Sequence, residues 1–241
     1  MGSAMFQRQS ELTDEPLVKL ADYNIACQPY NLRQILTKED NADFIIRSEP
    51  RDVWIRKTVA EMLQKVNVLL KPYGFEVRVD SAYRPLEVQS ELWSYFIKKA
   101  RRELKTDNPE KIRQHASAVC ADPTLFDPED SSTWPPHVTG GAVDVGLQDI
   151  NTKEKLLLDI PGYGKNIITH YAEMMPEKER LGPWPDYLKK RRILFNAMTM
   201  GGFTNNPHEW WHYDFGTPLY ALENHPENPV FYYGPAPHPE K

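Results

Sequence analysis

The sequence predicts a single α+β domain. Segments with the 3.6-residue apolar spacing of buried helices alternate along the chain with short segments of strand character. No repeat, low-complexity stretch or linker divides the 241 residues, and a hydrophobic content of 40% is enough for a sizeable core. We therefore expect one domain over residues 17–241, preceded by a flexible N-terminus over residues 1–16.

The first half of the chain contains two predicted helices and a strand. Apolar residues recur at helical spacing over 53–70, before Pro72 and Gly74 as stop signals. Residues 75–80 alternate apolar and polar side chains, as a half-buried strand does. A second helix is expected over 85–105, with a proline at its first position. The proline-punctuated first 50 residues are expected to wrap around the core.

Residues 106–136 contain five prolines and many acidic residues. We expect a long surface excursion there, with a short helix near 109–118, because this composition is typical of loops. Such an excursion often forms the wall of a neighbouring pocket. The remaining predicted elements are strands at 141–146 and 210–215 and a helix at 185–200 that ends at two glycines.

Charge and cysteine content argue against several classes of protein. The formal charge of −5 gives no general attraction to nucleic acid or anionic lipid, and the short basic clusters at 98–102 and 189–192 are expected to be solvated helix faces. The sequence contains no run of about 18 apolar residues, the length that a membrane-spanning helix needs. Cys27 and Cys120 lack CxxC spacing, so neither a disulfide framework nor a thiolate zinc site is indicated, and a single disulfide between them stays open.

The N-terminal sequence bears on localisation. Residues 1–4 resemble the remnant of an expression tag, and the sequence up to Met5 lacks the basic and apolar regions of a signal peptide. We expect a cytoplasmic protein, and the alternative is a periplasmic one whose export signal has been removed. Nothing in the sequence indicates the oligomeric state.

The most informative motif runs from His137 to Asp144 (HVTGGAVD) and is followed downstream by Glu209-Trp-Trp-His212. Two imidazoles and one carboxylate can hold one zinc ion per chain and leave a fourth position for water, whose pKa the metal lowers from ~15.7 to about 7. A further carboxylate, Glu209, can take the proton as the water attacks. The motif therefore predicts a zinc peptidase.

The spacing within this motif requires a break in the strand. His137 and Asp144 lie seven residues apart, so in an unbroken strand their side chains would point to opposite faces. We expect Gly140-Gly141 to supply the break, because glycine adopts backbone angles that other residues avoid. His137 would then turn toward the face of Ala142 and Asp144, with the small Ala142 leaving room beneath the site. Taken alone, His137 would be interpreted as an ordinary loop histidine, and it is the full motif that indicates a metal ligand.

A competing zinc motif overlaps the second segment, since residues 208–212 read H-E-x-x-H. On a helix this pattern places both histidines on a zinc ion with the glutamate as base. A proline immediately before it and the β-favouring run WWHYDF argue against a helix. We predict a strand in which His212 projects with Trp210 and Asp214, and in which His208 is a neighbour of the site and not a ligand.

Arg84 follows the first predicted strand, within Ser81-Ala-Tyr-Arg-Pro85. Between a strand end and a helix start, its guanidinium is expected at a pocket rim, where it can donate to the oxygen that becomes negative in a tetrahedral intermediate. The alternative is an arginine in a surface ion pair. Tyr83 and Tyr213 are expected to be packing residues.

Together these segments resemble the VanX-type D-alanyl-D-alanine dipeptidases, within a zinc peptidase superfamily that also includes D-alanyl-D-alanine carboxypeptidases and the hedgehog signalling domain. The matches are S-x-Y-R-P at 81–85, HxxGxAxD at 137–144 and E-W-W-H-Y at 209–213, within a similarity that spans about 17–220. The resemblance implies a compact α+β fold with a central antiparallel sheet flanked by helices. By the same resemblance, the zinc ligands are His137, Asp144 and His212, the catalytic base is Glu209, and the group that stabilises the transition state is Arg84.

Two departures from the family pattern concern the substrate. Pro135 stands where relatives carry a serine, and it offers neither a hydroxyl nor a backbone donor. Residues 161–165 stand where relatives tend to present an acidic group for the substrate amine, and nearby Asp159 is not assigned that role. The resemblance nevertheless implies a small dipeptide substrate, D-alanyl-D-alanine or a related one.

Two alternatives stay open at this stage. A carboxypeptidase or endopeptidase of the same superfamily would act on larger muropeptides, but such enzymes often carry a wall-binding module, which this chain lacks, and its long excursions could close the pocket. A zinc-binding signalling domain would have no turnover. Both Glu209 and Arg84 are retained here, which favours catalysis.

Overall fold

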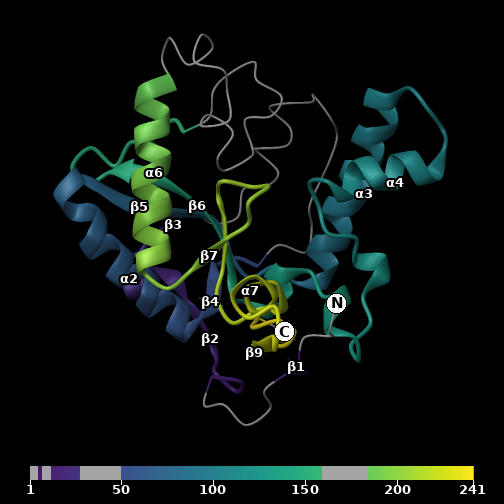
Figure 1. The fold of residues 1–241 in the computed structure, drawn as a ribbon, viewed down its shortest axis with the longest axis horizontal. Coiled ribbons are helices and arrows are strands. Elements are labelled where there is room, and N and C mark those ends of the chain that lie inside the picture. Colours follow the sequence, from purple (N-terminus) through teal and green to yellow (C-terminus); the bar gives the residue numbers. More distant parts are fainter. Residues whose placement is uncertain (1–4, 7–11, 28–49, 159–183, 241) are drawn as a thin grey trace.

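The computed structural model describes residues 5–6, 12–27, 50–158 and 184–240 (Figure 1). The helices are α2 (Lys57–Leu70), α3 (Leu86–Leu104), α4 (Pro109–Ser117), α6 (Trp184–Met200) and α7 (Pro218–Asn224), with short 3-10 turns η1 (Leu20–Tyr23), η2 (Lys71–Tyr73), η3 (Pro123–Leu125), η4 (Ser131–Thr133) and η5 (Pro136–Thr139). The strands are β1 (Met5–Phe6), β2 (Leu17–Lys19), β3 (Ala26–Cys27), β4 (Trp54–Arg56), β5 (Phe75–Ser81), β6 (Ala142–Asp149), β7 (Thr204–Asn205), β8 (His212–Asp214) and β9 (Val230–Phe231).

The predicted α+β class is confirmed, and the sheet at its centre has the order β3-β5-β6-β8-β7. Strands β5, β6, β8 and β7 pair antiparallel, as expected, whereas the edge strand β3 joins β5 in parallel. The pairs β1-β9 and β2-β4 form two small separate sheets. Because β5, β6 and β8 are neighbours, segments far apart in the sequence meet at one end of this sheet.

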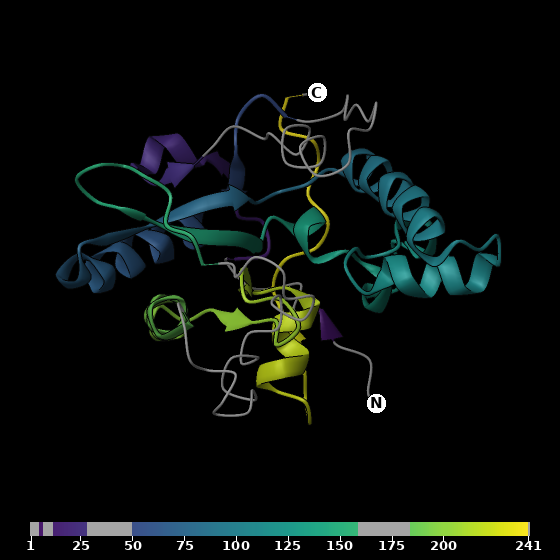
Figure 2. The ribbon, with the colours of Figure 1, turned by 90° about the horizontal axis from the view of Figure 1, so that it is seen from above.

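Helices occupy opposite ends of the molecule along its long axis, α2 and α6 at one and α3 and α4 at the other (Figures 1 and 2). Helix α2 buries one face against β5 and α6, and that face consists of Val59, Ala60, Met62, Leu63, Val66 and Leu70. A separate apolar cluster joins α3 to α4. The excursion predicted over 106–136 thus contains the predicted helix α4, which packs on α3.

The strand expected at 141–146 extends to Asp149, and other predicted boundaries were also wrong. The first helix begins at Lys57 and not at Val53, because Trp54–Arg56 form β4 against β2, and four residues of apolar pattern do not distinguish a strand from a helix turn. Pro85 is the residue before α3, not its first position. Strand β8 begins only at His212, after a turn.

The basic cluster at 189–192 also departs from the prediction of a solvated face. Lys189 is exposed, but Arg191 is buried, with 6% of its surface accessible. Its Nε donates to the Leu158 carbonyl at 2.8 Å and its guanidinium stacks 4.9 Å from the Trp210 ring centroid. A carbonyl acceptor and an aromatic face together make burial of this cation tolerable. Cys27 and Cys120 are free thiols, and no described helix is long and apolar enough to cross a membrane.

Arg56 connects three segments behind the site. Its side chain is buried, and it donates to the carbonyls of Thr139 at 2.8 Å, of Gly234 at 3.1 Å and of Glu15. The C-terminal segment 234–240 continues along the same region, where the Ala236 amide donates to the Val138 carbonyl at 2.8 Å and Tyr83 Oη donates to the Ala236 carbonyl at 3.0 Å. Arg56 therefore links Glu15 and Gly234 to the end of η5, and Ala236 bonds to η5 directly.

Arg56→Ala is expected to lower the free energy of unfolding by roughly 2–4 kcal/mol, because it leaves three carbonyls without their charged donor. Urea denaturation measures the change. Arg101→Ala is the matched control, since the Arg101 side chain is 58% exposed and its ion-pair partner Asp107 is 94% exposed. Equal effects of the two substitutions would contradict this account of Arg56.

Candidate metal centre

Three of the predicted site residues meet at the end of the central sheet. Asp144 on β6 lies directly opposite His212 on β8, and His137 comes from η5. One ligand atom from each lies within 4.8 Å of the others. His212 Nδ1 is 3.0 Å and His137 Nε2 is 3.4 Å from Asp144 Oδ1. The structure therefore brings together the two imidazoles and the carboxylate that the motif spacing singled out.

The break in the pleat lies at the predicted glycines. Gly140 ends η5 with φ +74°, a left-handed conformation that favours glycine, and a Cβ built there would lie 2.5 Å from Leu17 Cδ2. At Gly141 a Cβ would lie 2.5 Å from the Phe215 carbonyl oxygen. These two residues let the chain turn from η5 into β6, so that His137 and Asp144 share one face despite their odd spacing.

Each histidine presents a defined ring nitrogen to the centre. His137 Nδ1 is 2.7 Å from the Ala82 carbonyl oxygen, which can only accept, so this nitrogen carries the proton and Nε2 keeps its lone pair. His212 Nε2 donates to Asp214 Oδ2 at 2.9 Å, so Nδ1 is the nitrogen that faces Asp144. Two oriented imidazoles and a carboxylate, nearly buried, form a donor set that suits zinc.

Sequence reasoning missed the role of Asp214. This carboxylate is 1% exposed and lies across from Ala142, the small residue expected to leave room beneath the site. Its second oxygen accepts a hydrogen bond from Thr217 Oγ1 at 2.8 Å. Asp214 is thus fixed on one side by Thr217 and orients His212 on the other. The available signal was its position two residues after His212 in a strand, which puts both side chains on one face.

Removing the Asp214 carboxylate is expected to weaken zinc binding by about 10–100-fold, because a ligating imidazole depends on such a partner for its orientation and basicity. Titration of metal-free Asp214→Ala with zinc against a competing chelator gives the affinity. Asp107→Ala serves as control, since that side chain is 94% exposed. An unchanged affinity in Asp214→Ala would show that His212 needs no such support.

The charges of the three groups are strongly coupled. Burial disfavours charge on Asp144, but the charges and hydrogen bonds of His137 and His212 outweigh it and hold its pKa below the usual range. Burial also opposes a proton on His212, yet Asp214 and Asp144 raise its pKa well above normal. Burial and the Arg84 charge lower the pKa of His137. A metal entering this centre would therefore displace a proton from His212.

Glu209 lies beside the three groups, in the turn that precedes β8. Its Oε2 is 3.8 Å from His212 Nδ1, and Asn206 Nδ2 donates to the same oxygen at 3.4 Å. Burial raises the pKa of the Glu209 carboxyl to about 7. A carboxylate with a pKa near neutrality is suited to accept and return a proton.

Glu209 gives the metal-free protein a pH-dependent stability. A folded-state pKa of about 7 lies above the ordinary value of 4.5, so the fold prefers the protonated acid. The Glu209 contribution to stability should fall as the pH rises from about 4.5 to about 7 and then level off, at a cost of about 3 kcal/mol. Metal-free Glu209→Gln lacks this cost and should melt at a higher temperature than the wild type at pH 8 but not at pH 4.5. Equal melting temperatures at pH 8 would contradict the buried position of Glu209.

The competing H-E-x-x-H arrangement is not formed. Residues 206–211 are turn and loop, not helix, and His208 is exposed and stands outside the group of ligand atoms. Trp210, expected to project with His212, instead precedes the strand and packs against Arg191. The expected shared face of His212 and Asp214 is confirmed by their hydrogen bond.

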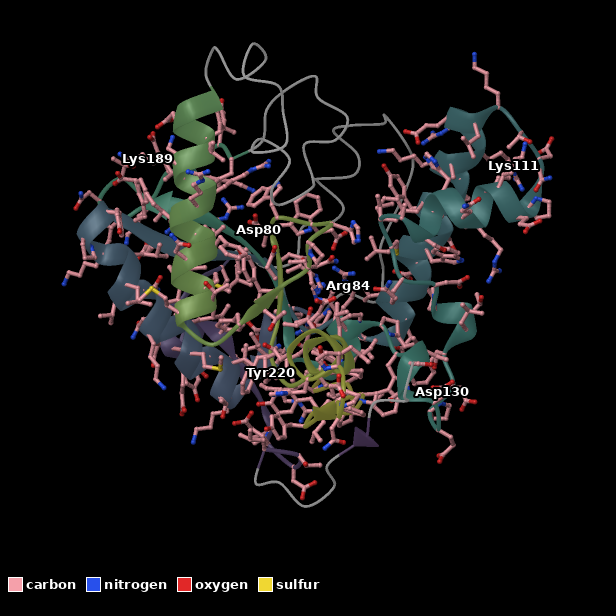
Figure 3. The ribbon with its side chains drawn as sticks, viewed as in Figure 1. Asp80, Arg84, Lys111, Asp130, Lys189 and Tyr220 are labelled. Atoms are coloured by element: carbon pink, nitrogen blue, oxygen red, sulfur yellow. The ribbon has the colours of Figure 1, made fainter. Side chains whose placement is uncertain are left out.

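Arg84 lies between β5 and α3, as expected, and points toward the middle of the molecule, whereas Lys111 and Asp130 lie at its periphery (Figure 3). It is 9% exposed, so it is not part of a surface ion pair. Its Nη2 is 3.0 Å from Ser81 Oγ and 3.4 Å from Asp144 Oδ2. Tyr83 and Tyr213 are buried packing residues, as expected.

Of the two departures from the family pattern, the structure describes the one at Pro135 but not the one at residues 161–165. Pro135 lies immediately before η5, and its carbonyl accepts a hydrogen bond from the Val138 amide at 3.1 Å. Asp159 and residues 161–165 lie outside the described residues.

The chain is similar in sequence to D-alanyl-D-alanine dipeptidases. A sequence model described as D-ala-D-ala dipeptidase matches residues 18–230. A D-alanyl-D-alanine dipeptidase from Synechocystis sp. is 28% identical over 178 residues, which cover 67% of this chain and 69% of that protein. A Zn(II) complex of a variant of the vancomycin resistance D,D-pentapeptidase VanY is 19% identical with a TM-score of 0.36, over 72% of this chain and 79% of VanY. The LD-carboxypeptidase LdcB is 18% identical with a TM-score of 0.34, over 73% and 64%.

Proposed function

Because this chain belongs to the D-ala-D-ala dipeptidase family of zinc peptidases, we propose that it hydrolyses D-alanyl-D-alanine or a closely related dipeptide. The observation that carries the proposal is the convergence of His137, Asp144, His212 and Glu209 at one end of the sheet, within a family match that covers residues 18–230. The 28% identical dipeptidase from Synechocystis sp. supports the choice of a dipeptide.

In this proposal His137 Nε2, a carboxylate oxygen of Asp144 and His212 Nδ1 hold the zinc ion. Bound zinc supplies Lewis-acid polarisation of the scissile carbonyl and lowers the pKa of water. The hydrogen bonds of His137 to Ala82 and of His212 to Asp214 keep the two imidazoles turned toward that position.

Glu209 and Arg84 have complementary roles in the reaction. As water attacks the carbonyl carbon, Glu209 takes its proton, and the carboxyl then gives that proton to the amine nitrogen as the C–N bond breaks. Arg84 donates to the carbonyl oxygen while it carries negative charge. Starting from one dipeptide and one water, these transfers release two amino acids.

The test is hydrolysis of a panel by the zinc-loaded protein: D,D and L,D dipeptides and an intact muropeptide, with free amino acid as the product measured. D-Alanyl-D-alanine is expected to have the highest kcat/KM. A preference for the muropeptide by about 100-fold would identify a carboxypeptidase or endopeptidase instead. A protein that binds zinc but cleaves nothing in the panel would fit a non-catalytic zinc-binding domain.

A further inference from the structure

Gln89 joins Arg84 to the excursion that follows α3. It lies in the first turns of α3 and is 1% exposed. Its Oε1 accepts from Arg84 Nη1 at 2.9 Å, and its Nε2 donates to the Ala121 carbonyl at 2.8 Å and to Cys120 Sγ at 3.3 Å. A buried amide is costly unless both its ends are paired, and here both are.

The orientation of this amide is fixed from both sides. A guanidinium can only donate, so the atom facing Arg84 must be the amide oxygen. The Ala121 carbonyl can only accept, so the atom facing it must be the amide nitrogen. Both constraints select the same orientation, and Gln89 therefore presents a stationary acceptor to Arg84.

The guanidinium of Arg84 has competing attractions. Nη1 is held by Gln89, while Nη2 lies between Ser81 Oγ and the Asp144 carboxylate. At 3.4 Å, the contact with Asp144 is longer than an Arg–carboxylate pair adopts when it is unrestrained and bidentate. Without the Gln89 acceptor, the strongest remaining attraction is Asp144, and the guanidinium would move toward that carboxylate.

Arg84 also retains a donor for a ligand. Its Nε is buried and has no acceptor among the residues that the structure describes. A buried unpaired donor beside a catalytic centre is costly, and a substrate oxygen would relieve that cost. Holding Nη1 and Nη2 in place keeps this donor in a constant position.

We infer that Gln89 is a positioning residue: it holds the Arg84 guanidinium off Asp144 and ties it to the backbone of the excursion at Ala121. The inference rests on the proposed function, in which Arg84 donates to the reacting oxygen. Gln89 acts in this inference through its hydrogen bond to Arg84. The excursion thereby influences the position of Arg84 through the Gln89 side chain of α3.

Gln89→Met, which keeps the length of the side chain but removes the hydrogen bonds to Arg84, Ala121 and Cys120, tests the inference. The expected result is a loss of kcat of about 10–100-fold, because a misplacement of about 1 Å can cost that much, with zinc affinity unchanged. Gln89→Glu keeps the acceptor for Arg84 but loses the donor to the Ala121 carbonyl, so it should lose less kcat than Gln89→Met. Gln114→Met on the exposed face of α4 is the matched control and should behave as the wild type.

A double-mutant cycle separates positioning from a general structural effect. If Gln89 acts through Arg84, adding Gln89→Met to Arg84→Ala causes no further loss of kcat. Full additivity of the two losses, or an unchanged kcat in Gln89→Met alone, would overturn the inference.

A crystal structure of Gln89→Met provides a readout that needs no turnover. The Arg84 guanidinium is expected closer to Asp144 than in the wild type, and an unmoved guanidinium would refute the positioning role. A wild-type protein that cleaves no dipeptide would instead refute the proposed function and leave this structural test intact.

Discussion

Glu209→Gln is expected to lower kcat for D-alanyl-D-alanine by about 10²–10⁴-fold while zinc stays bound. The amide keeps the size of the side chain and can still accept from Asn206, but it cannot take a proton from water. Because Glu209 is not one of the three clustered ligand groups, the metal content should match that of the wild type. Steady-state kinetics and metal analysis of the same preparation measure both quantities.

Glu223→Gln is the control for this substitution, since Glu223 is exposed on α7. It should leave kcat unchanged. A Glu209→Gln enzyme that keeps wild-type turnover would remove Glu209 from the mechanism, and one that has lost its zinc would make Glu209 a ligand and not a base.

His137→Ala and His208→Ala should behave oppositely, although each replaces a histidine that stands in a zinc-binding motif of the sequence. His137→Ala removes one of three ligand groups, so zinc affinity should collapse and turnover should fall by at least about 10³-fold, since bound metal contributes several kcal/mol to the transition state. His208→Ala should leave zinc content and turnover at wild-type levels, because His208 is exposed and outside the ligand group.

Zinc titration and X-ray absorption at the zinc edge distinguish the two variants directly. The loss of one imidazole from the coordination shell is expected in His137→Ala alone. Loss of zinc in His208→Ala would revive the overlapping H-E-x-x-H motif and contradict the arrangement described here.

The local sequence predicted the elements around the site because each has a strong local cause. Gly140 and Gly141 indicated a break in a strand from the parity of His137 and Asp144 alone, and the structure has that break. The long apolar pattern of α2 was equally clear, but the residue at which the helix begins was not. Residues 54–56 form β4 because they pair with β2, and β2 lies far away in the sequence.

The supporting contacts were beyond sequence reasoning because they depend on tertiary placement. Nothing in the local pattern distinguishes Gln89 from an exposed helix glutamine, and its role depends on Ala121, 32 residues away. Arg191 likewise looked solvated within a basic run until Trp210 and the Leu158 carbonyl were placed beside it. The candidate ligands could be predicted from the sequence. The hydrogen bonds that orient them, from His137 to the Ala82 carbonyl and from His212 to Asp214, were identified from the structure.

The hydrogen bond between the C-terminal segment and η5 has a consequence for biosynthesis. Val138, next to His137, is hydrogen-bonded to Ala236, and His212 is itself supplied late in the chain. Contacts of such long sequence separation form slowly and only after the distant partner exists. The three candidate ligand groups can therefore meet only after β8 has been synthesised and has paired with β6.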